Sequence, residues 1–296
     1  MNAALVHPAK NIVGESLVWD DRQKCLFWVD IVSKKIHALD PVTGDHLYWE
    51  TPDFVTSIGL RKDGGAIVGL TKRICLWDFG GSFETLAEIE PDEQDNRLNE
   101  GVVGPDGTFW VGTMQNNIAP DGSPLEITDS TGRLYRCSPD GTVTRINDDL
   151  FGITNTMIWP DARSFVTADT LENRLYRYKR NEETGKLSER TVLVDGFDRG
   201  LPDGSTLDAD GQIWNCRVVD GSCIIRIDQS GTVTKTEDLP CSWPTSCTFG
   251  GENLDTLYIT SARFTMDDER LKNYPQEGGL FAVKNGITGT PPYRFG

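Results

Sequence analysis

Long hydrophobic runs are missing from the sequence. Its apolar stretches are short, strand-like pieces, far below the ~20 residues that a membrane-spanning helix needs. The first ten residues carry no charged start followed by an apolar core, as a secretory leader would. We therefore expect no membrane-spanning segment and no leader.

Positive charge is also in short supply. The 296 residues include 29 Lys and Arg against 45 Asp and Glu, which gives a formal net charge of −16. A field of this sign repels both phosphate backbones and anionic lipid surfaces. The composition therefore argues against nucleic acid or a membrane as a partner.

Cysteine and histidine are few and scattered. The seven cysteines are odd in number, and the closest pairs, Cys216/Cys223 and Cys241/Cys247, lack the Cys-x-x-Cys spacing of a zinc knuckle. We expect reduced thiols and a cytoplasmic location instead of a disulfide framework. With three histidines and no Gly-x-Ser-x-Gly elbow, the sequence also offers no serine-hydrolase motif.

What the sequence does contain is an internal repeat. A short strand of aromatic and β-branched residues recurs six times, with starts separated by 40, 43, 56, 48 and 44 residues. The six copies are 26–30, 66–70, 109–113, 165–169, 213–217 and 257–261. A strand precedes each copy and another follows it, and most of the following strands end in a Gly-containing turn.

This repeat predicts the fold. Period-two alternation indicates strands, and a unit of about 45 residues with several strands is typical of a β-propeller blade. We predict an all-β, six-bladed β-propeller, one domain over residues 1–296, closed by the N-terminal strand or by Tyr293–Phe295. An irregular β-sandwich is the alternative. No stretch of ten residues has a helical period.

Polar residues fall at one equivalent position of the repeat. The strand before each copy would line the central channel, and its start lies six or seven residues before the turn that ends it. This position holds Glu15, Asn99, Asn155 and Asp203 in four repeats, and Thr56 or Ser57 and Thr245 or Ser246 in the other two. Ring closure would bring these side chains together at one mouth of the channel.

Oxygen-bearing side chains at one mouth predict a metal site in the central channel. Two carboxylates neutralise a 2+ ion, and an amide carbonyl adds a neutral ligand. His7, His37 and His46 lie outside these positions, as do the cysteines, which argues against a structural zinc site. The alternative is that the polar residues cap strand ends and bind channel water.

At these positions the sequence resembles the regucalcin/gluconolactonase family of sugar-lactone hydrolases. The matching stretches are 14–16, 96–101, 112–114, 154–155, 202–204, 247–251 and 277–281. They span essentially the whole chain. Single matches such as Gly-Glu-Ser are weak signals, but their order and the place of each in its repeat are specific. The resemblance implies a six-bladed propeller with one divalent cation in its channel.

The resemblance also implies roles for particular residues. Glu15, Asn155 and Asp203 match the family's metal ligands, and Arg97 and Asn99 match its substrate-contacting pair.

Three further positions bear on the substrate. Glu126 is the candidate for another family glutamate at the substrate, although the loop 115–131 matches poorly. The chain has Glu100 where the family often has Asp, and Thr156 where it often has Gly. Neither change removes a ligand, but both alter the pocket wall.

Metal-dependent hydrolysis of a lactone follows as the expected reaction. It needs a polarised carbonyl, an activated water and a stabilised oxyanion, which a divalent cation assists. Asp203 is the expected general base. Arg97 offers a planar set of donors for lactone oxygens or the oxyanion. Its alternative is a salt bridge to Asp92, Glu93 or Asp95.

The expected substrate is a small sugar lactone, opened to its aldonic acid in a sugar-oxidation pathway. The expected cofactor is one divalent cation: calcium, zinc, manganese, magnesium or iron(II), since all-oxygen sites accept each. Two other functions stay open. One is an ester or phosphotriester hydrolase on the same fold, which a more apolar channel mouth would favour. The other is a non-enzymatic propeller that binds calcium or a protein.

Overall fold

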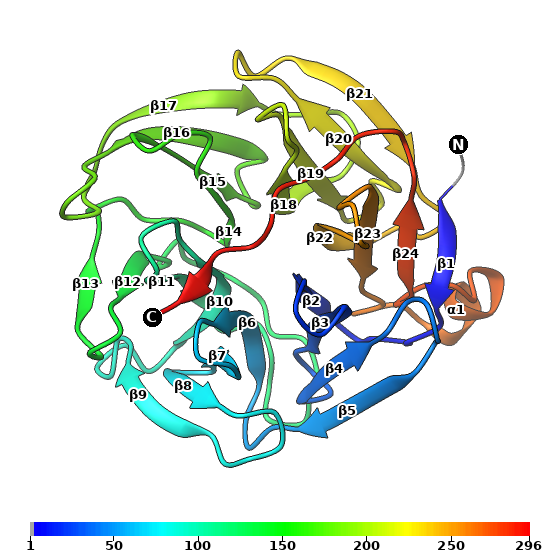
Figure 1. Ribbon diagram of the computed structural model, residues 1–296, viewed down its shortest axis with the longest axis horizontal. Coiled ribbons are helices and arrows are strands. Elements are labelled where there is room, and N and C mark those ends of the chain that lie inside the picture. Colours follow the sequence, from blue (N-terminus) through cyan, green and yellow to red (C-terminus); the bar gives the residue numbers. More distant parts are fainter. Residues whose placement is uncertain (1–2) are drawn as a thin grey trace.

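The structure is a closed ring of β-sheets. The computed structural model describes residues 3–296, and the chain runs once around a central channel, as Figure 1 shows. Six sheets surround the channel as blades, which confirms the six-bladed propeller predicted from the repeat. In the first five blades, consecutive antiparallel strands pair in chain order from the channel outward.

The first half of the chain forms three blades. Blade 1 consists of β2 (Gly14–Asp20), β3 (Cys25–Asp30), β4 (Lys35–Leu39) and β5 (His46–Glu50). Blade 2 consists of β6 (Val55–Arg61), β7 (Ala66–Leu70), β8 (Arg73–Trp77) and β9 (Glu84–Glu88). Blade 3 consists of β10 (Asn96–Val103), β11 (Phe109–Gln115), β12 (Leu134–Cys137) and β13 (Val143–Arg145).

The second half forms the other three. Blade 4 consists of β14 (Thr154–Ile158), β15 (Ser164–Asp169), β16 (Arg174–Arg180) and β17 (Leu187–Asp195). Blade 5 consists of β18 (Leu201–Leu207), β19 (Ile213–Val218), β20 (Cys223–Ile227) and β21 (Val233–Asp238). Blade 6 consists of β22 (Pro244–Gly250), β23 (Thr256–Ser261), β24 (Leu280–Val283) and β1 (Ala4–His7).

The N-terminal strand closes the ring. β1 pairs antiparallel with β24, with Leu5 opposite Phe281, so the first strand of the chain completes the last blade. This is one of the two closures that the sequence predicts. The C-terminal strand β25 (Arg294–Phe295) instead pairs in parallel with β6, with Arg294 opposite Leu60, and so adds a fifth strand to blade 2.

The hydrophobic core lies between neighbouring blades. Because side chains alternate along a strand, each blade presents an apolar face to the next one. Phe27 and Val29 of blade 1 join Ile58 and Val68 of blade 2 in one buried cluster, for example. The predicted aromatic and β-branched copies correspond to β3, β7, β11, β15, β19 and β23, the second strand of each blade.

Helix is a minor element. α1 (Asp268–Asn273) is the only helix in the part of the chain that the structure describes, and Asp267 caps it by accepting a hydrogen bond from the backbone of Arg270. From residue 3 onward, no helix has the length and hydrophobicity that crossing a membrane requires. All seven cysteines are free, as their scattered spacing predicts.

Candidate functional site

A bulge interrupts the innermost strand of every blade at the equivalent position. The pairing register shifts after Glu15 in β2, Val55 in β6, Leu98 in β10, Asn155 in β14, Pro202 in β18 and Pro244 in β22. A bulge leaves an extra residue outside the ladder and redirects its side chain. The polar positions predicted from the repeat fall within or next to these bulges, so one local irregularity, used six times, frees them from regular pairing.

Two carboxyl groups meet at this mouth of the channel. Glu15 of blade 1 and Asp203 of blade 5 lie within hydrogen-bonding distance of each other, and Asp203 is 5% exposed. Burial, and then the charge of Asp203, raises the pKa of Glu15. Burial, and then the charge of Glu100, raises the pKa of Asp203. Burial also raises the pKa of Glu100, to about 7. Protons therefore compete with any cation for this cluster.

The donor set fits a divalent cation. None of the ion pairs within residues 3–296 includes Glu15 or Asp203. Buried carboxylates without a positive partner are costly, and a hard cation bound by oxygen atoms relieves that cost. No three His, Cys, Asp or Glu side chains in the described part of the chain form a group that could hold a metal ion. The candidate set therefore depends on an amide.

Asn155 supplies that amide. It lines the same cavity as the two carboxylates. Its Nδ2 donates to Oγ1 of Thr170 at 2.8 Å, which leaves Oδ1 as the group that can accept or ligate. Oδ1 in turn accepts a hydrogen bond of 3.1 Å from Nδ2 of Asn99. Partners of this kind orient a metal-ligating side chain.

Arg97 presents its guanidinium to the same cavity. It is 4% exposed, and its Nη1 and Nη2 donate to Oδ1 of Asn99 and of Asn117, each at 2.8 Å. These contacts hold the planar group in one orientation. Burial lowers the pKa of Arg97 to about 10, so the group remains charged at neutral pH. No ion pair of the described residues joins Arg97 to the acidic loop 92–95, so the predicted alternative of a salt bridge is not observed.

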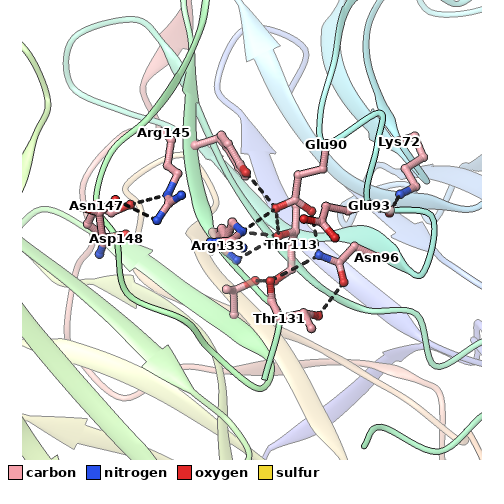
Figure 2. A network of polar contacts seen from close by, with 12 residues as sticks. Lys72, Glu90, Glu93, Asn96, Thr113, Thr131, Arg133, Arg145, Asn147 and Asp148 are labelled. Atoms are coloured by element: carbon pink, nitrogen blue, oxygen red, sulfur yellow. Dashed lines mark hydrogen bonds and ion pairs between the residues drawn. The ribbon is translucent and has the colours of Figure 1, made fainter. Parts of the chain in front are cut away.

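A buried polar network fixes the strand that carries Arg97. Figure 2 shows Glu90 accepting hydrogen bonds from Nδ2 of Asn96 at 2.8 Å and from Oγ1 of Thr113 at 3.1 Å. Asn96 also accepts a bond of 2.5 Å from Oγ1 of Thr131. Because the Glu90 side chain is only 4% exposed, these bonds are shielded from water and hold their geometry well. They anchor β10 one residue before Arg97.

The site opens into a cavity of about 430 Å³. Its walls include the five polar residues predicted from four blades: Glu15, Arg97, Asn99, Asn155 and Asp203. Ring closure brings these distant residues together, as the repeat predicts. Of the hydroxyl positions in the other two blades, Thr245 also lines the cavity, whereas Thr56, Ser57 and Ser246 do not.

The structure does not bring Glu126 to the cavity. It is exposed on the loop between β11 and β12, whereas its neighbours Leu125 and Ile127 line the cavity wall. Its role stays a prediction. Three polar residues of the cavity, Asn117, Thr170 and Thr265, were not singled out from the sequence. Asn117 belongs to the poorly matching loop, and Thr170 follows β15 without any motif that marks it.

Thr156 adopts an unusual backbone conformation beside the candidate ligand Asn155. Its φ of 56° lies in the left-handed region, which is strained for a β-branched residue. Glycine, frequent here in the family that the sequence resembles, adopts this φ without strain. In this chain Oγ1 of Thr156 donates to the backbone oxygen of Asp203 at 2.5 Å and lies 2.8 Å from Oγ of Ser205. The hydrogen bond from this hydroxyl therefore fixes the backbone of Asp203 and offsets part of the strain at Thr156.

The chain is similar to known proteins over a range that includes all the proposed ligands and Arg97. The family model described as SMP-30/Gluconolactonase/LRE-like region matches residues 13–263. The chain is 33% identical to regucalcin from Gallus gallus over 288 residues, which are 96% of this chain and 94% of that protein. It is 34% identical to 6-deoxy-6-sulfogluconolactonase from Pseudomonas putida over 283 residues, 94% and 93% of the two chains. The crystal structure of a calcium-binding protein, regucalcin, from Agrobacterium tumefaciens matches with a TM-score of 0.90 and 26% identity over 100% of this chain and 98% of that one.

Proposed function

Because the chain belongs to the SMP-30/gluconolactonase/LRE-like family, we propose that it hydrolyses a sugar lactone to the corresponding aldonic acid with the help of one divalent cation. One observation carries the proposal. Two carboxyl groups that form no ion pair among the described residues, Glu15 and Asp203, adjoin a cavity that also holds the oriented guanidinium of Arg97. Support also comes from the 6-deoxy-6-sulfogluconolactonase to which the chain is 34% identical.

Glu15, Asn155 and Asp203 would hold the cation. Together they offer two negative charges and a neutral oxygen, which suits calcium, magnesium or manganese and also accommodates zinc or iron(II). When bound, the cation supplies Lewis-acid polarisation of the lactone carbonyl. The relative described as a calcium-binding protein supports the binding of a divalent ion.

Asp203 would act as the general base. Its burial raises its pKa, which brings its basicity closer to that needed to take a proton from water at neutral pH. As Asp203 takes one proton from the water, the water oxygen adds to the carbonyl carbon. The ring C–O bond then breaks and the leaving alkoxide takes that proton from Asp203. The carboxylic acid formed releases its own proton to solvent, so the products are a carboxylate, a free hydroxyl and one proton.

Arg97 and Asn99 would orient the lactone. Nη1 of Arg97 donates to Oδ1 of Asn99 and to the backbone oxygen of Leu98, and Nε and Nη2 donate to Oδ1 of Asn117. One N–H of Nη2 is therefore the donor left for a substrate. A charged, rigid donor beside the carbonyl stabilises negative charge as it develops on oxygen.

An apolar wall keeps a second function open. Fifteen of the twenty-four residues that line the cavity are apolar, and an apolar mouth favours a hydrolase that cleaves esters or phosphotriesters. The same three carboxylate and amide groups would serve such a reaction.

A panel of aldono-1,4- and 1,5-lactones, assayed by proton release, tests the proposal. Phenyl acetate and paraoxon extend the panel to the second function. We expect lactone turnover that a chelator abolishes and a divalent cation restores. Turnover of phenyl acetate or paraoxon without any lactone turnover would favour the second function. Activity toward none of them, with cation present, would leave a binding protein.

A further inference from the structure

The cavity at the channel mouth is polar on one side and at its base. The polar side comes from Arg97, Asn99 and Asn117, and Arg97 is the only Lys or Arg among the lining residues. The base carries the proposed cation ligands. Most of the remaining wall is apolar.

The wall opposite Arg97 offers almost no hydrogen bonds. Trp243 directly precedes β22, and Phe264 follows shortly after β23, both in blade 6. Figure 1 places β22 and β10 on opposite sides of the channel. The one polar side-chain atom of Trp243, Nε1, donates to Asp220 at 3.3 Å. Phe264 has no polar side-chain atom. A substrate group that faces Trp243 or Phe264 therefore meets carbon, and the exposed Thr265 adds the one hydroxyl beside them.

Exposed aliphatic side chains gather at the rim. Leu125, Leu171 and Val219 come from blades 3, 4 and 5, are 47%, 49% and 40% exposed, and all line the cavity. Ten large hydrophobic side chains are exposed in the described part of the chain, and three of them stand at this one opening. Such a concentration beside a cavity marks a surface that an apolar group covers.

Two of the three threonines of the wall, Thr170 and Thr245, are already engaged. Oγ1 of Thr170 donates to the backbone oxygen of Pro202 at 2.8 Å and accepts from Asn155. Oγ1 of Thr245 donates to the backbone oxygen of Gly14. Apart from the exposed hydroxyl of Thr265, the free hydrogen-bonding capacity of the cavity is therefore concentrated at the blade 3 side and at the base.

From this division we infer that the site takes a lactone whose ring oxygens face blade 3 and the base, and whose far end is apolar, as in a 6-deoxy sugar lactone. The inference rests on the proposed lactonase function and adds the substrate class. A 6-hydroxyl turned toward Trp243 would lose its bonds to water without replacement, whereas a methyl group gains by burial. A sulfonate or phosphate at that end would have no positively charged side chain to pair with, because Arg97 is the only Lys or Arg that lines the cavity.

Matched pairs of ligands test the inference. Three pairs, the glucono-, galactono- and mannono-1,4-lactones and their 6-deoxy counterparts, differ in ring stereochemistry, so no single configuration has to be assumed. The corresponding 1,4-lactams are not hydrolysed, and calorimetry gives their affinities independently of turnover. In the stereochemical series that binds best, we expect about tenfold tighter binding of the 6-deoxy lactam and a similar preference in kcat/KM.

Variants on the side of the cavity away from blade 3 locate the preference. Phe264→Asn and Val219→Asn add a polar group there, and each should reduce the ratio of 6-deoxy to 6-hydroxy affinity at least threefold. Leu150→Asn is the matched control, since Leu150 is 47% exposed but does not line the cavity. Its ratio should equal that of the wild type. Circular dichroism of each variant confirms that it is folded.

The outcomes separate this inference from the function on which it rests. If the 6-hydroxy lactams, or a 6-sulfonated lactam, bind as tightly as the 6-deoxy lactams or more tightly, the inference is overturned. Lactone turnover in the same experiment would still support the proposed function. Lactams that bind without turnover of any lactone overturn the function. A preference that neither Phe264→Asn nor Val219→Asn changes contradicts the placement of the apolar end on the side away from blade 3.

Discussion

At the scale of single residues, the environment of Asp203 sets it apart from the other acids of the chain. Its carboxyl is buried beside Glu15, with Glu100 also raising its pKa. An acid placed in this way holds a cation when one is present and takes a proton when it is not. Both properties suit a residue that would serve as ligand and as general base.

Replacing Asp203 by Asn keeps one oxygen and removes both the base and one negative charge. We expect turnover to fall at least about 100-fold, in the range that loss of a general base costs, and cation affinity to weaken. Lactone hydrolysis with saturating cation measures the first effect, and calorimetric titration measures the second. Asp198→Asn, on an exposed acid outside the cavity, is the control. Wild-type turnover in Asp203→Asn at saturating cation would show that Asp203 is not the base.

Arg97→Ala should give a different pattern. The side chain is placed toward the substrate and is not among the proposed ligands, so cation affinity should stay within about twofold of the wild type while kcat/KM falls at least tenfold. The same two measurements report both quantities, and Arg163→Ala, at an exposed arginine, controls for loss of charge. Loss of the cation together with activity would contradict this division of roles.

At the scale of strands, the sequence indicates on which strands the site residues lie, but not the backbone conformation that directs their side chains. The alternation and the repeat identify the inner strands and locate Glu15, Asn99, Asn155 and Asp203 at their starts. The bulges cannot be deduced in this way, because a register shift depends on pairing with the next strand. Non-glycine residues with positive φ, such as Thr156, likewise carry no sequence signal, since tertiary contacts impose that conformation.

Loops were the least predictable part of the site. The loop between β11 and β12 contributes Asn117, Leu125 and Ile127 to the cavity. Glu126, the acid of this loop that was predicted to bind substrate, is exposed and does not line the cavity. A loop has no periodicity from which to deduce an orientation. Residue type alone therefore does not indicate which side of the loop faces the cavity, and the substrate-binding role of Glu126 stays a prediction.

All three histidines of the chain meet where β1 adjoins blade 1. Nδ1 of His37 on β4 lies 3.0 Å from Nε2 of His46 on β5, and the ring of His7 on β1 lies 4.3 Å from that of His46. Burial lowers the pKa of each, and lowers that of His37 to about 3. The cluster is therefore neutral in the folded protein at pH values at which a free histidine takes up a proton.

Acid should weaken the fold through this cluster. The folded pKa of His37 lies below the unfolded value of about 6.5, so the unfolded chain binds the extra proton, and stability falls as pH drops below about 6.5. His37→Gln should remove up to about 1.4 kcal/mol of this loss per pH unit. Urea unfolding at pH 7.5, 6.0 and 5.0 measures it, with Tyr48→Phe as a control that keeps all three histidines. Parallel pH dependences in wild type and His37→Gln would refute the assignment.

At the scale of the whole molecule, closure of the ring makes the site possible. The candidate residues come from blades 1, 3, 4 and 5, and they line one cavity only because β1 joins the end of the chain to its beginning. The sequence predicted both the number of blades and this closure as one of two possibilities. The repeat alone does not decide between them, because either terminus could supply the missing strand.

Deleting residues 1–7 should therefore destabilise the protein as a whole. The loss of β1 removes its backbone hydrogen bonds to β24 and exposes an edge strand. A few backbone bonds at about 1 kcal/mol each amount to about 2–5 kcal/mol, or roughly 5–15 °C in Tm for a chain of this size. Differential scanning calorimetry measures this shift. An unchanged Tm would show that closure does not depend on β1.

The central claim is that Glu15, Asn155 and Asp203 hold one divalent cation at the channel mouth, and a crystal structure of the protein soaked with Mn²⁺ tests it most directly. Anomalous scattering locates the ion independently of any assumption about its ligands. We predict a single strong peak with oxygen atoms of all three side chains at about 2.0–2.6 Å from it. A peak elsewhere in the molecule, or three side chains whose oxygens point to different places, would contradict the claim.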